Sequence, residues 1–227
     1  MNKLIEEPLL REKLHVFRDR KKAGRLLAEK LKKYRYTDTV VMGIPSGGVP
    51  VAAEISGYLN FPMDLIIVRK IQIPFNPEAG FGAMDPDGGI ILNEKLLSRL
   101  YITEDEIKKQ INRTKEVIKK RNQLFRGERS FTSMKNKNVI LADDGLASGF
   151  TMLAATRFFR RKHPSKIIVA VPTASEKTVD FILPETDELV CLNIRSGFPF
   201  AVADAYINWY DLSDEEVLDI LRKSGSE

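Results

Sequence analysis

An apolar segment that ends in two acids and a glycine-containing loop constrains this chain more than any other feature. Residues 139–142 read Val-Ile-Leu-Ala, and Asp143, Asp144 and Gly145 follow directly. A short aliphatic run without polar alternation is typical of a parallel strand that is buried on both faces. In an open sheet of such strands, ligands bind beyond the carboxyl ends of the strands. The two acids therefore stand where a doubly wound α/β fold would place a binding site.

Apolar patterns elsewhere alternate between strands and helices, which predicts βαβ units and a mostly parallel sheet. The chain of 227 residues has the length of one ordinary domain. We therefore predict a single α/β domain, 1–227, with a doubly wound sheet. The expected strands are residues 39–43, 64–69, 139–142, 166–172 and 188–192, and the expected helices are residues 19–33, 51–59, 151–161 and 177–183 and a segment after Ser213.

The segment between residues 70 and 138 departs from this alternation. Residues 70–93 are rich in proline and glycine, which predicts an irregular hairpin or a mobile flap. A capping-box pattern from Thr103 to Glu106 then opens a long charged helix with a narrow apolar stripe. We treat residues 71–138 as a flap and long-helix insertion that could serve as a lid on the sheet.

Composition limits the partners, the disulfides and the location that we expect for this protein. The net charge of +5 and the pI near 9.2 suit a phosphorylated ligand, nucleic acid or an anionic surface, and they do not choose among these. The sole cysteine, Cys191, excludes an internal disulfide and lies in an apolar run. The sequence shows neither a signal-peptide pattern nor an apolar run of membrane-spanning length. We expect a cytoplasmic protein without a membrane partner.

The loop after the acid pair has the features of a phosphate-binding site. Gly145 and Gly149 allow a tight turn and a close approach of the backbone to a ligand. The amides from Ala147 to Thr151 can point into one concavity at the start of a helix, and the Ser148 and Thr151 hydroxyls add donors. Two carboxylates beside a phosphate are explained if they accept hydrogen bonds from ribose hydroxyls or face a magnesium ion. The segment thus describes a ribose 5-phosphate site.

Residues 139–151, Val-Ile-Leu-Ala-Asp-Asp-Gly-Leu-Ala-Ser-Gly-Phe-Thr, resemble the signature with which type I phosphoribosyltransferases bind 5-phosphoribosyl-1-pyrophosphate (PRPP). Residues 43–52, Gly-Ile-Pro-Ser-Gly-Gly-Val-Pro-Val-Ala, look like the pyrophosphate loop of a poorly characterised branch of that family. The resemblance to this branch extends to residues 68–70, 76–78, 82–83 and 190–192. It implies the type I phosphoribosyltransferase fold, Mg²⁺ as cofactor, and a C-terminal hood over the acceptor.

The resemblance also implies a role for each candidate site residue. Asp143 and Asp144 would bind the ribose hydroxyls as the catalytic acids, and no residue is assigned as a direct metal ligand. The 5-phosphate would be bound by Ala147, Ser148, Gly149, Phe150 and Thr151. The pyrophosphate would be bound by Ser46, Gly47 and Gly48, with Arg69 and Lys70 nearby.

The implied reaction belongs to nucleotide metabolism: a nitrogen acceptor, with a nucleobase as the expected class, displaces pyrophosphate from PRPP. The branch usually has arginine at the position of Ser46, so a non-catalytic PRPP or nucleotide sensor of the same fold stays open. The basic pI alone suggests nucleic-acid binding, but the sequence has no nucleic-acid motif, so we do not expect that partner. The identity of the acceptor and the oligomeric state, including a homodimer, stay open.

Overall fold

The computed structural model describes residues 3–225, with the backbone alone for residues 77 and 78. Its main sheet has six strands in the order β1-β9-β8-β7-β2-β3, and every neighbouring pair is parallel. This arrangement confirms the predicted mostly parallel sheet. The strands are β1 (Leu4–Ile5), β2 (Thr39–Gly43), β3 (Met63–Leu65), β7 (Asn138–Ala142), β8 (Lys166–Ser175) and β9 (Glu188–Arg195).

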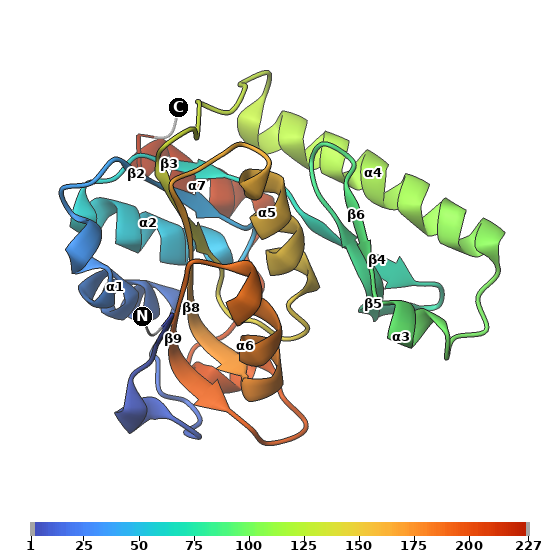
Figure 1. The fold of residues 1–227 in the computed structure, drawn as a ribbon, viewed down its shortest axis with the longest axis horizontal. Coiled ribbons are helices and arrows are strands. Elements are labelled where there is room, and N and C mark those ends of the chain that lie inside the picture. Colours follow the sequence, from blue (N-terminus) through green and yellow to red (C-terminus); the bar gives the residue numbers. More distant parts are fainter. Residues whose placement is uncertain (1–2, 226–227) are drawn as a thin grey trace.

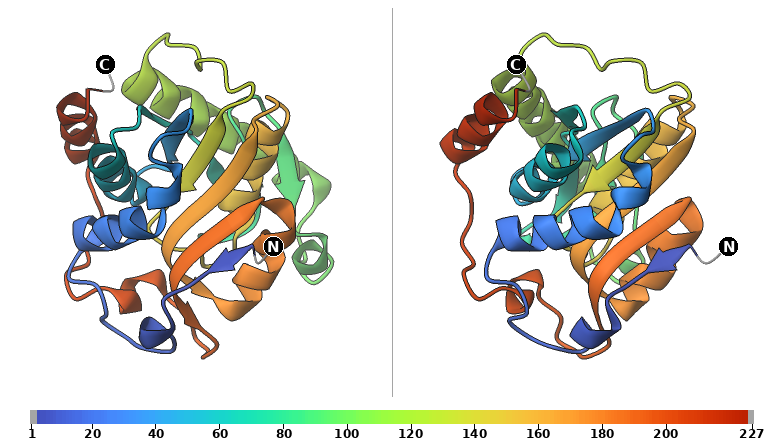
Figure 2. Two further views of the ribbon diagram at one scale, coloured as in Figure 1. Left: turned by 60° about the vertical axis from the view of Figure 1, so that its left-hand side comes forward. Right: turned by 90° about the vertical axis from the view of Figure 1, so that its left-hand side faces the viewer.

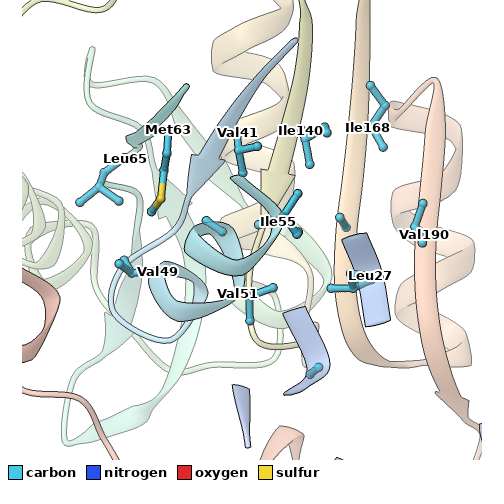
Figure 3. Packing of buried hydrophobic residues seen from close by; sticks show 14 of the residues in the cluster. Leu27, Val41, Val49, Val51, Ile55, Met63, Leu65, Ile140, Ile168 and Val190 are labelled. Carbon is cyan, nitrogen blue, oxygen red and sulfur yellow. The ribbon is translucent and has the colours of Figure 1, made fainter. Parts of the chain in front are cut away.

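Helices cover both faces of this sheet, as a doubly wound fold requires (Figure 2). Alternate strand residues such as Val41 and Ile140 pack with α1 and α2 on one face (Figure 3), whereas Val40 and Leu141 pack with α5 and α6 on the other. The period-two alternation of strands produces these two cores. The helices are α1 (Arg20–Lys30), α2 (Gly48–Leu59), α5 (Phe150–Arg160), α6 (Glu176–Ile182) and α7 (Asp214–Lys223), with short 3-10 helices at Pro8–Leu10, Lys32–Tyr34, Leu183–Glu185 and Val202–Ala205.

The helix starts follow from local sequence. The Asp19 side chain accepts a hydrogen bond from the Lys22 amide and begins α1, and Ser213 with Glu216 forms the capping box of α7. Helix α2 begins at Gly48, so the predicted start at residue 51 is three residues late. Its Gly-Val-Pro opening reads as a turn in the sequence, but proline is tolerated in a first helical turn, where its missing N–H costs no hydrogen bond.

A second, antiparallel sheet lies beside the main sheet (Figure 1). It consists of β4 (Arg69–Ile73), β5 (Asn76–Met84) and β6 (Ile90–Leu92), and the β4–β5 hairpin is irregular as predicted, with register shifts around Gln72. Two helices follow, α3 (Glu94–Leu97) and the long α4 (Glu104–Arg126), and α4 starts at the predicted capping box. The predicted strand at residues 64–69 exists, but its predicted extent is too long, because β3 ends at Leu65 and Arg69 already belongs to the second sheet.

The strand register brings two loops together at the carboxyl edge of the main sheet. Gly43 at the end of β2 stands opposite Ala142 at the end of β7, and Ala142 stands opposite Ala170 of β8. The loops that follow β2 and β7 are therefore neighbours. None of the helices in the described part of the chain combines the length and the apolar character that a membrane span needs.

Candidate active site

The loop after β2 lies directly against the acid pair after β7. A Cβ atom added to Gly47 would lie 1.8 Å from Asp144 Oδ2, and one added to Gly48 would lie 2.5 Å from the Ala142 carbonyl oxygen. Only glycine allows this approach of one loop to the other. The structure therefore brings the two predicted halves of the site, the acid pair and the Ser46–Gly48 loop, into one place.

The two acids have different partners. Asp143 accepts a hydrogen bond from the Asp144 amide at 2.8 Å, whereas Asp144 Oδ2 accepts one from Arg20 Nε at 2.9 Å. The Tyr206 hydroxyl donates to the Asp144 carbonyl at 2.6 Å. The Arg20 side chain is almost fully buried, and its guanidinium lies 3.9 Å from the centre of the Trp209 ring. Asp144 is thus held in place by α1 and by the C-terminal segment, whereas Asp143 accepts its hydrogen bond from the neighbouring backbone.

Burial and mutual charge govern the ionisation of the pair. Burial, followed by the charge of Asp144, raises the pKa of Asp143 well above the ordinary aspartate value. Burial also raises the pKa of Asp144, and the Arg20 guanidinium opposes that rise. Without a ligand, Asp143 is therefore the carboxyl that more readily keeps a proton. A cation at the pair would favour the ionised form of both acids.

A pH-dependent stability follows from the raised pKa of Asp143. The folded chain binds this proton more tightly than the unfolded chain does, so its stability falls as the pH rises from the ordinary aspartate range through the raised pKa. Asp143→Asn removes the titration. We expect the melting temperature of this variant, measured relative to wild type, to rise as the pH is raised above the ordinary aspartate range, about pH 4. Melting curves that stay parallel as the pH is raised would contradict the environment assigned to Asp143.

The loop after the acids leads into the N-terminus of α5. Leu146 donates its amide to the Thr173 carbonyl at 2.9 Å, and the Thr178 hydroxyl donates to the Ala147 carbonyl at 2.5 Å, which fixes the loop between β8 and α6. Ala147 and Ser148 are exposed. Gly149 has φ +79° and sits so close to α6 that a Cβ would lie 2.8 Å from Thr178 Cγ2. The first amides of α5 are left without helical acceptors and are suited to binding an anion.

Phe150 is the one bulky residue in this predicted phosphate loop. Its ring packs 5.3 Å from the ring of Phe181 on α6, measured between centroids. The side chain is therefore turned toward α6, and the loop can present the Phe150 amide together with the backbone and hydroxyl of Thr151. The predicted phosphate-binding residues are compatible with one short concave loop.

The two cations predicted to bind pyrophosphate, Arg69 and Lys70, point to opposite faces of the second sheet. Half-buried Arg69 lies near Arg121 of α4, and burial followed by the charge of Arg121 lowers the pKa of Arg69. Lys70 faces the opposite side of β4 because strand side chains alternate, and its aliphatic part runs beside Gly80. The structure therefore brings Arg69 toward α4 and leaves Lys70 on the other face of the second sheet.

Sequence patterns miss three residues of this region: Arg20, Tyr206 and Arg121. Arg121 Nη2 donates to Ser46 Oγ at 2.9 Å, so a residue of the long helix reaches the loop after β2. Arg20 and Arg121 each stand in a charged helix whose polar residues suggest a solvated face. A helical-face analysis would have placed Arg20 among the buried positions Ala23 and Leu27, but it would not have shown the partner.

The family model described as phosphoribosyl transferase domain matches residues 18–84 and 86–207, a span that includes both loops and the acid pair. The chain belongs to the phosphoribosyl transferase family. This result confirms the family resemblance and agrees with the α/β fold of the structure.

Two curated proteins and one crystal structure are similar to most of this chain. Proteins from two strains of Mycobacterium tuberculosis, CDC 1551 / Oshkosh and H37Rv, carry the provisional name of phosphoribosyl transferase and are 34% identical to this chain over 211 residues. The alignment covers 93% of this chain and 47% of each relative, so the chain spans about half their length. A crystal structure of a protein from Thermus thermophilus is similar, with a TM-score of 0.74, 35% identity, and coverage of 91% of this chain and 98% of that one.

Proposed function

We propose that this phosphoribosyl transferase moves the 5-phosphoribosyl group of PRPP to a nitrogen acceptor and releases pyrophosphate. The observation that carries the proposal is the contact between Gly47 and the Asp144 carboxylate. It supports one ligand that spans both loops, with a ribose at the acids and phosphates on either side. PRPP has this composition, since its ribose lies between a 5-phosphate and a 1-pyrophosphate.

Each part of the site has a task in this reaction. The loop from Ala147 to Thr151 would hold the 5-phosphate with its amides and hydroxyls, which positions ribose C1 for attack. The acid pair would accept hydrogen bonds from the ribose hydroxyls. The bond between C1 and the pyrophosphate oxygen breaks, the pyrophosphate leaves with the electron pair, and the acceptor nitrogen forms the new bond to C1. The nitrogen then loses its proton, and Asp143 is the better base because Asp144 is paired with Arg20.

Mg²⁺ fits the donor set of this site. Among the side chains that the structure describes (residues 3–76 and 79–225), no three acidic, histidine or cysteine side chains gather into a metal-binding group. Mg²⁺ commonly keeps several waters and is bound by one or two carboxylates together with substrate phosphates. Asp143 and Asp144 supply such carboxylates, and burial raises the pKa of both, so a bound cation would favour their ionised forms. Bound Mg²⁺ would offset the charge of the leaving pyrophosphate.

The proposed acceptor is a nucleobase or another nitrogen heterocycle. Trp209 and Tyr210 are 36% and 55% exposed and stand over Arg20, beside the acid pair. Exposed aromatic rings next to a ribose site are suited to stacking a planar base. In the same proposal, the second sheet and α4, within residues 71–138, form the wall or lid that keeps water from ribose C1.

Pyrophosphate release tests the proposal. Wild-type protein with PRPP, Mg²⁺ and a pool of nucleobases should release pyrophosphate in a pool-dependent manner, and the Asp143→Asn variant should not. Splitting the pool would then identify the acceptor. Tight PRPP binding without release in any pool would instead support the sensor alternative. An absence of both PRPP binding and release would show that the proposed function is wrong.

A further inference from the structure

The loop after β2 receives a charged side chain from far away in the sequence. Arg121 of α4 donates through Nη2 to Ser46 Oγ at 2.9 Å, and the same nitrogen pairs with Asp214 Oδ1 of α7 at 2.9 Å. Figure 2 shows α7 next to α4. Ser46 is neutral, so the loop between β2 and α2 has no cation of its own. Arg121 places a guanidinium there, from the long helix of the insertion.

A second arginine shares this region. Arg69 lies close enough to Arg121 that the charge of Arg121, after burial, helps to lower the pKa of Arg69. Among the side chains that the structure describes (residues 3–76 and 79–225), none forms a hydrogen bond or an ion pair with the Arg69 guanidinium. The buried Nε of Arg121 also has no hydrogen-bond partner among the described residues. Two arginines and one carboxylate leave an excess positive charge and several guanidinium donors beside the loop.

We propose that Arg121, assisted by Arg69, binds the diphosphate group of PRPP, and that Asp214 is a counter-ion which the diphosphate displaces. The inference rests on the proposed function, because it assigns a residue pair to the leaving group of that reaction. A guanidinium presents a planar fork of donors that matches phosphate oxygens, and two adjacent forks match the two phosphates of a diphosphate. The Gly48 amide donates to the Ile44 carbonyl oxygen at 3.0 Å, so the guanidinium groups are the donors that this inference assigns to the diphosphate.

Asp214 is suited to being displaced. Its side chain is 51% exposed, and exposed ion pairs contribute little to stability. As the first residue of α7, it also keeps a favourable interaction with the helix N-terminus after Arg121 leaves. Arg121 itself is 17% exposed and packs over the Phe125 ring at 5.0 Å, so its side chain is held at the loop with or without Asp214. The ion pair with Asp214 thus neutralises the Arg121 guanidinium when no diphosphate is bound. It is not what holds the Arg121 side chain at the loop.

The test compares two ligands that divide PRPP between them. We would measure the dissociation constants of inorganic pyrophosphate and of ribose 5-phosphate, each with Mg²⁺, by calorimetry. Arg121→Gln should weaken pyrophosphate binding by about 10- to 100-fold, the range expected for loss of charge-assisted hydrogen bonds, and leave ribose 5-phosphate within about twofold. Arg121→Lys should retain part of the pyrophosphate affinity. Asp214→Asn should tighten pyrophosphate binding by up to about fivefold, since the competing carboxylate is gone.

Arg113→Gln is the matched control, because it makes the same charge change at an exposed position of α4. It should change neither affinity by more than about twofold. Unchanged pyrophosphate affinity in Arg121→Gln would overturn the inference, and so would an equal loss of both ligands, which indicates a structural role. A wild-type chain that binds ribose 5-phosphate but not pyrophosphate would also overturn it. A wild-type chain that binds neither would overturn the proposed function and the inference with it.

Discussion

Replacing Asp143 by asparagine should lower phosphoribosyl transfer by about 100-fold or more while the chain stays folded. The structure explains why this substitution should lower the rate of phosphoribosyl transfer without lowering the stability of the folded chain. Asp143 accepts a hydrogen bond from the Asp144 amide at 2.8 Å, and an asparagine side chain keeps the oxygen that accepts it. Burial and the charge of Asp144 raise the pKa of Asp143, so a neutral side chain also removes an unfavourable charge. The Asp143→Asn variant therefore lacks a ribose-binding carboxylate and a base, whereas its folded state keeps the same stability or gains some.

The measurement is the rate of pyrophosphate release at saturating PRPP, together with the melting temperature of the same preparation. Asp144→Asn is a poorer probe, because it leaves Arg20 buried without its carboxylate partner. Breaking a buried pair in this way costs roughly 3–5 kcal/mol, so a loss of activity could be a loss of folding. If Asp143→Asn released pyrophosphate within about twofold of wild type, the assignment of the acid pair to the reaction would be wrong.

The parts of the site that are contiguous in sequence could be predicted from sequence. The strand at residues 139–142, its acids and its glycine loop form one unbroken pattern, and residues 39–43 with the loop after them form another. In both cases local propensity, burial on two faces and the chemistry of the following loop indicate the same structure. In a parallel sheet, the two loops would then lie at the same edge. Neither sequence segment, however, indicates that β2 and β7 are neighbouring strands.

The contacts that complete the site could not be predicted in this way. Arg20 and Arg121 reach their partners across 124 and 75 residues of chain, and single polar residues at such separations leave no periodic signal. The predicted extent of the strand at residues 64–69 is too long for a related reason. Ile66 and Val68 are buried, but they lie where the chain crosses from the main sheet to the second one. A short apolar run indicates burial and does not distinguish a strand from a buried crossover.

The largest effect outside the acids is expected at Gly47. Its φ of −61° and ψ of −33° are accessible to any residue, so alanine would introduce no backbone strain. The added Cβ would instead lie 1.8 Å from Asp144 Oδ2 and 2.4 Å from Asp144 Cγ. Either the carboxylate turns away from Arg20 or the loop retreats from the acids. A displacement of about 1 Å between groups that act on one ligand costs about 100-fold in rate, so Gly47→Ala should abolish most turnover.

The same substitution at a nearby glycine provides the control. Gly57 is exposed in α2 and has nothing within 4 Å of an added Cβ, so Gly57→Ala should stabilise the chain by about 0.5–1 kcal/mol and leave turnover unchanged. Gly47→Ala should destabilise by about 1–3 kcal/mol, the usual range for an overpacked contact, and should lose affinity for PRPP. Denaturant unfolding and PRPP titration of both variants measure these effects. Wild-type turnover in Gly47→Ala would mean that the two loops do not act on a common ligand, because their contact is what the added methyl group breaks.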